Sequence, residues 1–550
     1  MSRPAWFGVL PFLGRHASPR EASPPVQGLV IAGGGARASF QIGALRYLYE
    51  HEHIAPQVIT ATSAGSILGA LLAQSRDPAD QLSALRDIEK LWLGMSQSSD
   101  MFTERSWFTR LKSHADALEV LRQMEESADR QDTEHGSGLW SRFGWGSRQS
   151  ATRANAASQT ETDIDADEPG TSQGNDGLSR TTAPTRDMQA SDPGRPDGTV
   201  TTPLATQLSP QERTLALAMA EEPGEPLGWT PNVFFQLAAG LPHLGRASAD
   251  LTAAWRGLEN NRSLFKPGPI LRRLLSRDFF HSERVTASGV TLRCAFVGLN
   301  SGELRYMRED GHIVDRDDQL LPGRAFDISM GVLASCSIPG VFKPVEMNDE
   351  WYVDGGIREN VPVEEAVSNL GVTRPYVIVS GPSGLNFDAH VGSGDLISIL
   401  FRVQSIQSDE SERDEVAYAR STGAVVIEPG LSVHDSMHFD PGTLRINRDY
   451  GWIRAAEAVH EADGDVQAVN REIIQTRVRA WQRERQMYPG GDHEFDQVML
   501  DELSQLKLRL QTLLKSADMS LLPPGAENWW IHAEGRDEAT GPRDSARFPR

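Results

Sequence analysis

Cysteine is scarce in this chain, which has only Cys294 and Cys336 among its 550 residues. Both lie in apolar stretches typical of a protein core, and two cysteines cannot form the disulfide framework of a small secreted domain. We therefore expect a reducing compartment and predict a cytoplasmic location. Peripheral contact with a membrane and secretion as an effector are the alternatives that the sequence leaves open.

Positive charge and long apolar runs are also lacking. The chain has 54 Lys and Arg against 75 Asp and Glu, a net charge of −21, which argues against a nucleic-acid partner because such a partner requires a basic surface. No window is apolar over the length needed to span a bilayer. The N-terminal run Ala5–Leu13 is interrupted by proline and is too short for a typical secretory signal. These absences predict a soluble protein.

Lysine is absent, and apolar residues are sparse, from Ser127 to Pro203. A segment of this composition cannot bury enough surface to offset its chain entropy, so we predict disorder. The apolar piece Val233–Leu241 that follows suggests either a core helix or a lid. The predicted division is a flexible leader (1–26), the first part of an α/β domain (27–126), a disordered acidic insertion (127–210), the second part of the domain, with lid-like helices (211–430), a helical C-terminal region (431–534) and a disordered tail (535–550).

The stretch Val58–Leu68 predicts a strand, a tight turn and a helix, with Ser63 at the turn. The flanking residues Ala61, Ala64 and Gly65 are small, as a crowded turn around an exposed nucleophile requires. Serine is also a favoured helix N-cap, and Ser-x-Gly triplets occur elsewhere in the chain. This stretch alone therefore supports a nucleophile and a structural cap about equally.

A run of three glycines precedes that stretch. The predicted strand Gln27–Ala32 leads into Gly33-Gly34-Gly35-Ala36-Arg37 and then into a helix from about Ser39 to Glu52. Glycines let backbone N–H groups point at a ligand, and a helix N-terminus adds partial positive charge, so the loop is suited to a phosphate or to the oxyanion of a tetrahedral intermediate. The order strand–helix–strand also predicts a mostly parallel sheet with helices on both faces.

A nucleophilic serine requires a base, and no histidine lies in a context that marks it as catalytic. His390 alone fits a Ser–acid–His order, and it lies in a polar loop. Asp354 is better placed, since it ends the predicted strand Trp351–Asp354 and is followed by Gly355 and Gly356. A strand end in a parallel sheet opens toward the site, and a carboxylate with a raised pKa can act as general base.

These elements together resemble the patatin-like phospholipase family: Gly-Gly-Gly-x-Arg after the first strand, x-x-Ser-x-Gly after the second and Asp-Gly-Gly some 290 residues later. The segment Ala334–Pro344 resembles the family's A-S-x-x-x-P-x-x-F-x-P, and Asn360 with Pro362 matches its N-x-P. The resemblance covers roughly residues 27–75 and 285–430. It leaves the insertion and the C-terminal helices unexplained.

The resemblance implies a three-layer α/β fold and a serine hydrolase that cleaves acyl esters of lipids or phospholipids, with neither metal nor cofactor. It implies Ser63 as nucleophile and Asp354 as base of a Ser–Asp dyad, and an oxyanion loop built from Gly33, Gly34, Gly35, Ala36 and Arg37. Gly65, Gly355 and Gly356 support these motifs. Protein partners are not predicted.

Two positions depart from the family pattern. Ala61 stands where the first glycine of G-x-S-x-G is usual, and Ala38 replaces a glycine after the oxyanion loop. Alanine costs little at negative φ but is costly at positive φ. The sequence leaves three other functions open. One is a dinucleotide-binding domain, which expects an acidic residue where the second strand ends in Ala61-Thr62-Ser63. The others are an inactive scaffold and an acyltransferase that uses the same dyad.

Overall fold

The structure is a computed structural model of the whole chain, and it describes residues 25–106, 109, 263–385, 396–487 and 497–534. The predicted insertion, the apolar piece 233–241 and His390 lie outside the described residues. So do most of the leader and all of the tail. The predictions for these segments stay predictions.

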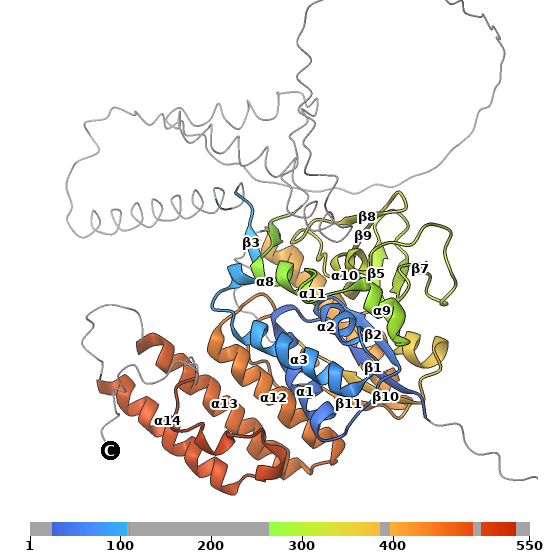
Figure 1. Cartoon of the computed structure of the whole chain (residues 1–550). Helices are drawn as coiled ribbons and strands as arrows, with labels where there is room; N and C mark the ends of the chain where they lie inside the picture. Colours follow the sequence, from blue (N-terminus) through green and yellow to red (C-terminus); the bar gives the residue numbers. More distant parts are fainter. Residues whose placement is uncertain (1–24, 107–108, 110–262, 386–395, 488–496, 535–550) are drawn as a thin grey trace, which may run out of the picture. The chain divides into compact units, whose positions relative to one another are not determined.

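A parallel sheet forms the centre of the described fold (Figure 1). Five strands lie side by side in parallel, in the spatial order β11 (Val425–Ile427), β10 (Arg374–Ile378), β1 (Gln27–Ile31), β2 (Val58–Thr62) and β5 (Thr291–Gly298). Four antiparallel strands extend it beyond β5: β6 (Leu304–Arg308), β7 (Ile313–Val314), β8 (Val345–Met347) and β9 (Glu350–Asp354). The predicted mostly parallel sheet is thus confirmed.

The side chains of the sheet alternate between two cores, as the pleat of a strand requires. Leu29 and Ile31 of β1 pack into one core, while Val30 and Ala32 pack into the other. The first core is shared with α1 (Ala38–Glu50), α2 (Ala64–Leu72), α3 (Pro78–Leu93) and α12 (Pro441–Val459), and the second with residues 361–372 and with α11 (Leu396–Ser421). Helices therefore cover both faces, as expected for an α/β fold with three layers.

The remaining short elements lie around this sheet. They are β3 (Phe102–Glu104), β4 (Phe265–Pro267), α8 (Pro269–Leu274), α9 (Ser282–Ser288) and α10 (Ile328–Ser335). The apolar run over 328–335 predicts a helix, and α10 has these bounds. The 26-residue helix α11 was not predicted, because its exposed polar face hides the periodicity of its few buried residues, such as Val416 and Ala419.

The C-terminal region is helical, as expected. It consists of α12, α13 (Gly464–Met487) and α14 (Gln497–Ser516), which run beside one another (Figure 1). Ile473 and Ile474 of the basic helix α13 are fully buried, so this apolar face packs within the protein. No helix in the described part of the chain is long and apolar enough to cross a membrane.

Candidate active site

The register of the sheet brings Ser63 and Asp354 together over one strand. Thr62, the last residue of β2, pairs with Ala295 of β5, and Asp354, the last residue of β9, pairs with the next β5 residue, Phe296. Since β6 occupies the other edge of β5 at these positions, β9 continues on the edge that β2 leaves. The two strands approach from opposite directions, and their carboxyl ends meet.

This arrangement corrects one step of the sequence argument. We expected Asp354 at the end of a strand within the parallel sheet, but β9 runs antiparallel to β5. An antiparallel strand on the opposite side of β5 would have carried its carboxyl end away from Ser63. Here the head-to-head meeting with β2 places Asp354 beside the turn.

The turn at Ser63 holds a strained backbone conformation. Ser63 has φ 53° and ψ −127°, a region that costs a non-glycine residue roughly 1–3 kcal/mol. Its backbone is fixed on both sides: the N–H donates to Ser335 Oγ at 2.8 Å, and the carbonyl accepts from Ser66 N–H at 2.8 Å and from Cys336 Sγ at 3.1 Å. These contacts maintain a geometry that the residue would not adopt alone.

Small residues let the helix after the turn lie close to the sheet. A Cβ on Gly65 would come within 2.4 Å of the carbonyl oxygen of Ile31, so only glycine fits there. The methyl group of Ala61, which departs from the family pattern, faces Gly69 of α2. The missing side chain at Gly69 makes room for the extra methyl group.

Asp354 is buried, and its two carboxylate oxygens differ. Oδ1 accepts the N–H of Gly356 at 2.8 Å, whereas Oδ2 has no hydrogen-bond partner of regular geometry within the described part of the chain. Burial raises the pKa of Asp354 to about 6, and interactions with the Ser63 side chain and the Gly356 N–H oppose that rise. A carboxyl group with a pKa near neutrality and a free oxygen near a serine is suited to accept a proton.

Within the described residues, two N–H groups of the glycine loop are available as hydrogen-bond donors to a ligand. Three of its N–H groups already donate to backbone carbonyls: Gly33 to Asn360 at 3.2 Å, Ala36 to Ser436 at 2.7 Å and Arg37 to Gly34 at 3.1 Å. Within the described ranges, the N–H groups of Gly34 and Gly35 have no such partner. Gly35 has φ 56°, which glycine adopts without strain. The loop thus offers two donors, while Gly33 lies against the Cβ of Ser63.

Arg37 ends this loop and Ala38 follows it, and the structure shows the surroundings of the first and the backbone conformation of the second. The guanidinium of Arg37 lies against Gly381, and a Cβ there would be 2.3 Å from it. Burial raises the pKa of Glu412 to about 7, and the Asn360 side chain and the positive charge of Arg37 oppose that rise, so Arg37 acts on α11. Ala38 has φ −57°, a conformation in which the methyl group that replaces glycine costs nothing.

Sequence reasoning missed the residues that connect these motifs. Ser335 and Cys336 hold the backbone of Ser63, and the carbonyl of Ser337 accepts the N–H of Asp354 at 3.0 Å. The segment was noticed only as a family motif, yet it joins nucleophile and base. Glu412 and Glu415 of α11 gave no signal, because carboxylates on an unpredicted helix look like part of a solvated surface.

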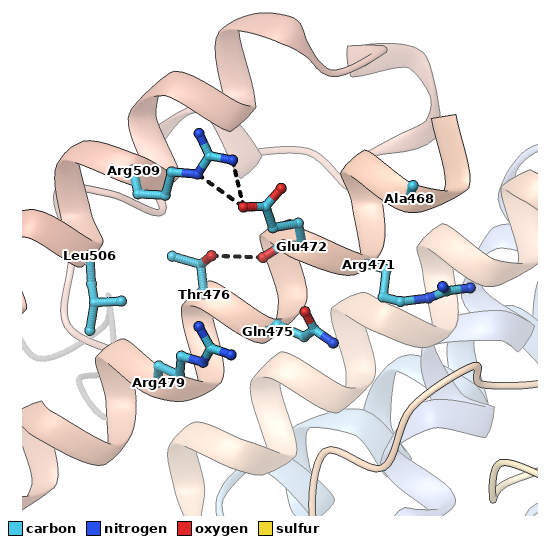
Figure 2. A pocket seen from close by; sticks show the side chains of 8 residues that line it. All are labelled: Ala468, Arg471, Glu472, Gln475, Thr476, Arg479, Leu506 and Arg509. Atoms are coloured by element: carbon cyan, nitrogen blue, oxygen red, sulfur yellow. Dashed lines mark hydrogen bonds and ion pairs between the residues drawn. The ribbon is translucent and has the colours of Figure 1, made fainter. Parts of the chain in front are cut away.

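The C-terminal helices have a separate hollow of about 520 Å³ between α13 and α14 (Figure 2). Arg509 pairs there with Glu472 at 2.6 Å. The other lining residues are Ala468, Arg471, Gln475, Thr476, Arg479 and Leu506. None of the predicted site residues lies on these two helices, so the hollow has no part in the chemistry of the serine.

A match to a family model agrees with the fold. The model of the family described as patatin-like phospholipase matches residues 29–183 and 213–367, more than half of the chain. The crystal structure of VipD from Legionella pneumophila is similar over 94% of this chain and 93% of that one, with 14% identity and a TM-score of 0.29. A similarity at this level supports no conclusion about activity.

Proposed function

Because the chain belongs to the patatin-like phospholipase family, we propose that it hydrolyses acyl ester bonds of lipids through an acyl-enzyme on Ser63. The observation that carries this proposal is the meeting of β2 and β9 over Ala295 and Phe296, which puts the Asp354 carboxyl beside the Ser63 side chain. A serine whose environment supplies a base and oxyanion donors is the minimum that acyl transfer requires.

In the first half of the reaction, the Ser63 hydroxyl oxygen attacks the ester carbonyl carbon and Asp354 takes its proton. The carbonyl oxygen becomes an oxyanion, for which the N–H groups of Gly34 and Gly35 are the proposed donors. When the C–O bond breaks, the departing alkoxide takes the proton from Asp354 and leaves as the alcohol. The acyl group stays on Ser63.

In the second half, water attacks the acyl carbon and Asp354 accepts its proton. Collapse of the intermediate releases the fatty acid and returns that proton to the Ser63 oxygen. Each proton given up is recovered, so Ser63 and Asp354 return to their starting state. The pKa of about 6 for Asp354 leaves the carboxyl mostly ionised at neutral pH, as a base must be, yet close enough to neutrality to return the proton.

The proposal is tested with a fluorescent fluorophosphonate, which phosphonylates activated serines. Wild-type protein should become labelled, Ser63→Ala should not, and Asp354→Asn should react roughly 10²–10⁴-fold more slowly because the general base is lost. Ser421, exposed and part of another Ser-x-Gly triplet, provides the matched control: Ser421→Ala should label like wild type. Release of fatty acid from phosphatidylcholine vesicles and from a p-nitrophenyl ester then tests lipid and simple ester substrates.

A folded wild-type protein that stays unlabelled even with vesicles present would contradict the proposal and favour a scaffold with the same fold. Labelling that survives Asp354→Asn would mean that another group is the base. Transfer of the acyl group to an added alcohol, measured against free fatty acid, distinguishes hydrolysis from acyl transfer.

A further inference from the structure

Two glutamates of α11 accept hydrogen bonds from the segment that follows Asp354, the proposed base. Glu415 accepts the N–H of Asn360 at 3.1 Å and the N–H of Val361 at 2.7 Å. Glu412, one helical turn earlier, accepts from the side-chain amide of Asn360 at 2.5 Å. Both carboxyl groups therefore act on two adjacent residues, Asn360 and Val361, through three separate donors.

Asn360 in turn contacts both halves of the candidate active site. Its backbone carbonyl accepts the N–H of Gly33 at 3.2 Å, and its Oδ1 lies so close to Gly33 that a Cβ there would be 2.3 Å away. The same oxygen lies near Gly356, where a Cβ would be 3.1 Å from it. Asn360 is thus wedged between the oxyanion loop and the turn that begins at Asp354.

The segment around Asn360 is also tied to the strand of the nucleophile. Thr60 and Thr62 of β2 donate their hydroxyl groups to the carbonyls of Pro362 at 2.7 Å and Glu359 at 3.1 Å. Ser408 of α11 reaches the carbonyl of Gly356 at 3.5 Å. One helix therefore contacts the loop after the base, and that loop contacts the loop of the oxyanion donors.

We infer that Glu415 and Glu412 are positioning residues, which hold Asn360 so that its carbonyl fixes Gly33 and sets the oxyanion loop opposite Ser63. The inference rests on the proposed function for its catalytic meaning. Neither glutamate touches substrate; each acts through Asn360. A movement of α11 would therefore displace the oxyanion loop through Asn360, because Glu415 contacts Asn360 and Asn360 contacts Gly33.

The charge state of these groups fits a hydrogen-bonding role. Burial, together with the nearby Glu359, raises the pKa of Glu415 to about 9, and the backbone N–H of Val361 opposes the rise. At neutral pH the group is therefore mainly a neutral carboxyl, which still accepts N–H donors through its carbonyl oxygen. A glutamine keeps such an acceptor and the neutral charge, whereas methionine keeps the length of the side chain and removes the acceptor.

The test compares full-length Glu415→Met, Glu415→Gln and Glu410→Met. Glu410 lies on the same helix and its side chain is 75% exposed, so its substitution controls for changes in helix composition. Glu415→Met should reduce kcat and the rate of fluorophosphonate labelling about 10- to 100-fold, since small displacements of positioned groups cost rates of this order. KM should change little. Glu415→Gln should retain most of the rate, and Glu410→Met should match wild type.

Amide hydrogen exchange gives a second readout that does not need activity. In Glu415→Met, peptides covering residues 29–40 should exchange faster, while peptides from α13 should not change. An unchanged exchange rate in a folded Glu415→Met protein, or equal loss of activity in Met and Gln variants, would overturn the inference. If wild type is not labelled at all, the proposed hydrolase function fails, and the exchange data alone still decide whether Glu415 positions the loop.

Discussion

Two buried groups of charges in this protein are stabilised in opposite ways. In the C-terminal region, Arg477 of α13 is 1% exposed and bonds Glu534 at 2.7 and 2.8 Å and Asp449 at 2.8 Å. Its guanidinium also lies over the ring of Trp529, 3.7 Å from the centroid. Near Ser63, by contrast, the carboxylate of Asp354 has no arginine or lysine partner among the described residues and accepts only one regular hydrogen bond.

The pKa values follow from this difference. Burial alone would lower the pKa of Arg477, but Glu534 and Asp449 outweigh it and the pKa rises, so the guanidinium stays charged. At Asp354, burial has no compensating positive charge and raises the pKa to about 6. A buried carboxylate with a cationic partner serves as a fixed structural contact, whereas one without a partner remains able to exchange a proton.

The largest effect is expected from the removal of Arg477, the cation paired with Glu534 and Asp449. Arg477→Met would leave Glu534 and Asp449 buried without their cation, which typically costs 3–5 kcal/mol of the free energy of unfolding. We expect a correspondingly lower midpoint in urea denaturation. Labelling of Ser63 in the fraction that remains folded should be unchanged, because neither β2 nor β9 contains a partner of Arg477.

Arg479→Met is the matched control, since Arg479 lies on the same helix and is exposed; it should alter stability by no more than about 0.5 kcal/mol. A stable Arg477→Met protein would show that the buried arginine is replaceable by apolar packing. Loss of labelling in the folded fraction would show that the C-terminal helices support the site directly.

A second prediction concerns the unpaired group. Because the base must be ionised, the labelling rate should rise with pH through a pKa of about 6 and be about tenfold lower at pH 5 than at pH 8. The pKa is raised relative to an unfolded aspartate, so ionising Asp354 disfavours the folded state. Wild type should therefore lose stability relative to Asp354→Asn as pH rises from about 4 to 6.

The measurements are labelling rates and urea midpoints at a series of pH values. A rate that is flat between pH 5 and pH 8 would mean that Asp354 is ionised throughout this range or is not the base. An inflection near pH 4 would indicate a positive group close to the carboxyl, in conflict with the absence of such a partner in the described residues.

The parts of the fold and the site that could be predicted from the sequence are those with a clear local pattern or a family motif. The strands and helices with uniform apolar character were predictable, as the agreement at α10 shows, and so was the proximity of Ser63, the glycine loop and Asp354 through a family motif. The antiparallel direction of β9 could not be predicted, because strand direction depends on pairing with distant residues such as Phe296. Nor could α11, whose contacts with Asn360 exist only after folding.

The smallest effect is expected from substitutions that relieve or keep the backbone strain at Ser63. Ser63 has φ 53°, and alanine at this position would keep the Cβ that makes such a backbone costly, whereas glycine would not. Ser63→Gly should therefore be about 1 kcal/mol more stable than Ser63→Ala, after allowance for the greater entropy of glycine in the unfolded chain. The control is Ala70→Gly in α2, which should instead destabilise the protein by about 1 kcal/mol, since Ala70 has a helical backbone. If Ser63→Gly were the less stable of the two Ser63 variants, the contacts from Ser335 and Cys336 would not be holding a strained turn, and the contrast with the C-terminal ion pairs would rest on Asp354 alone.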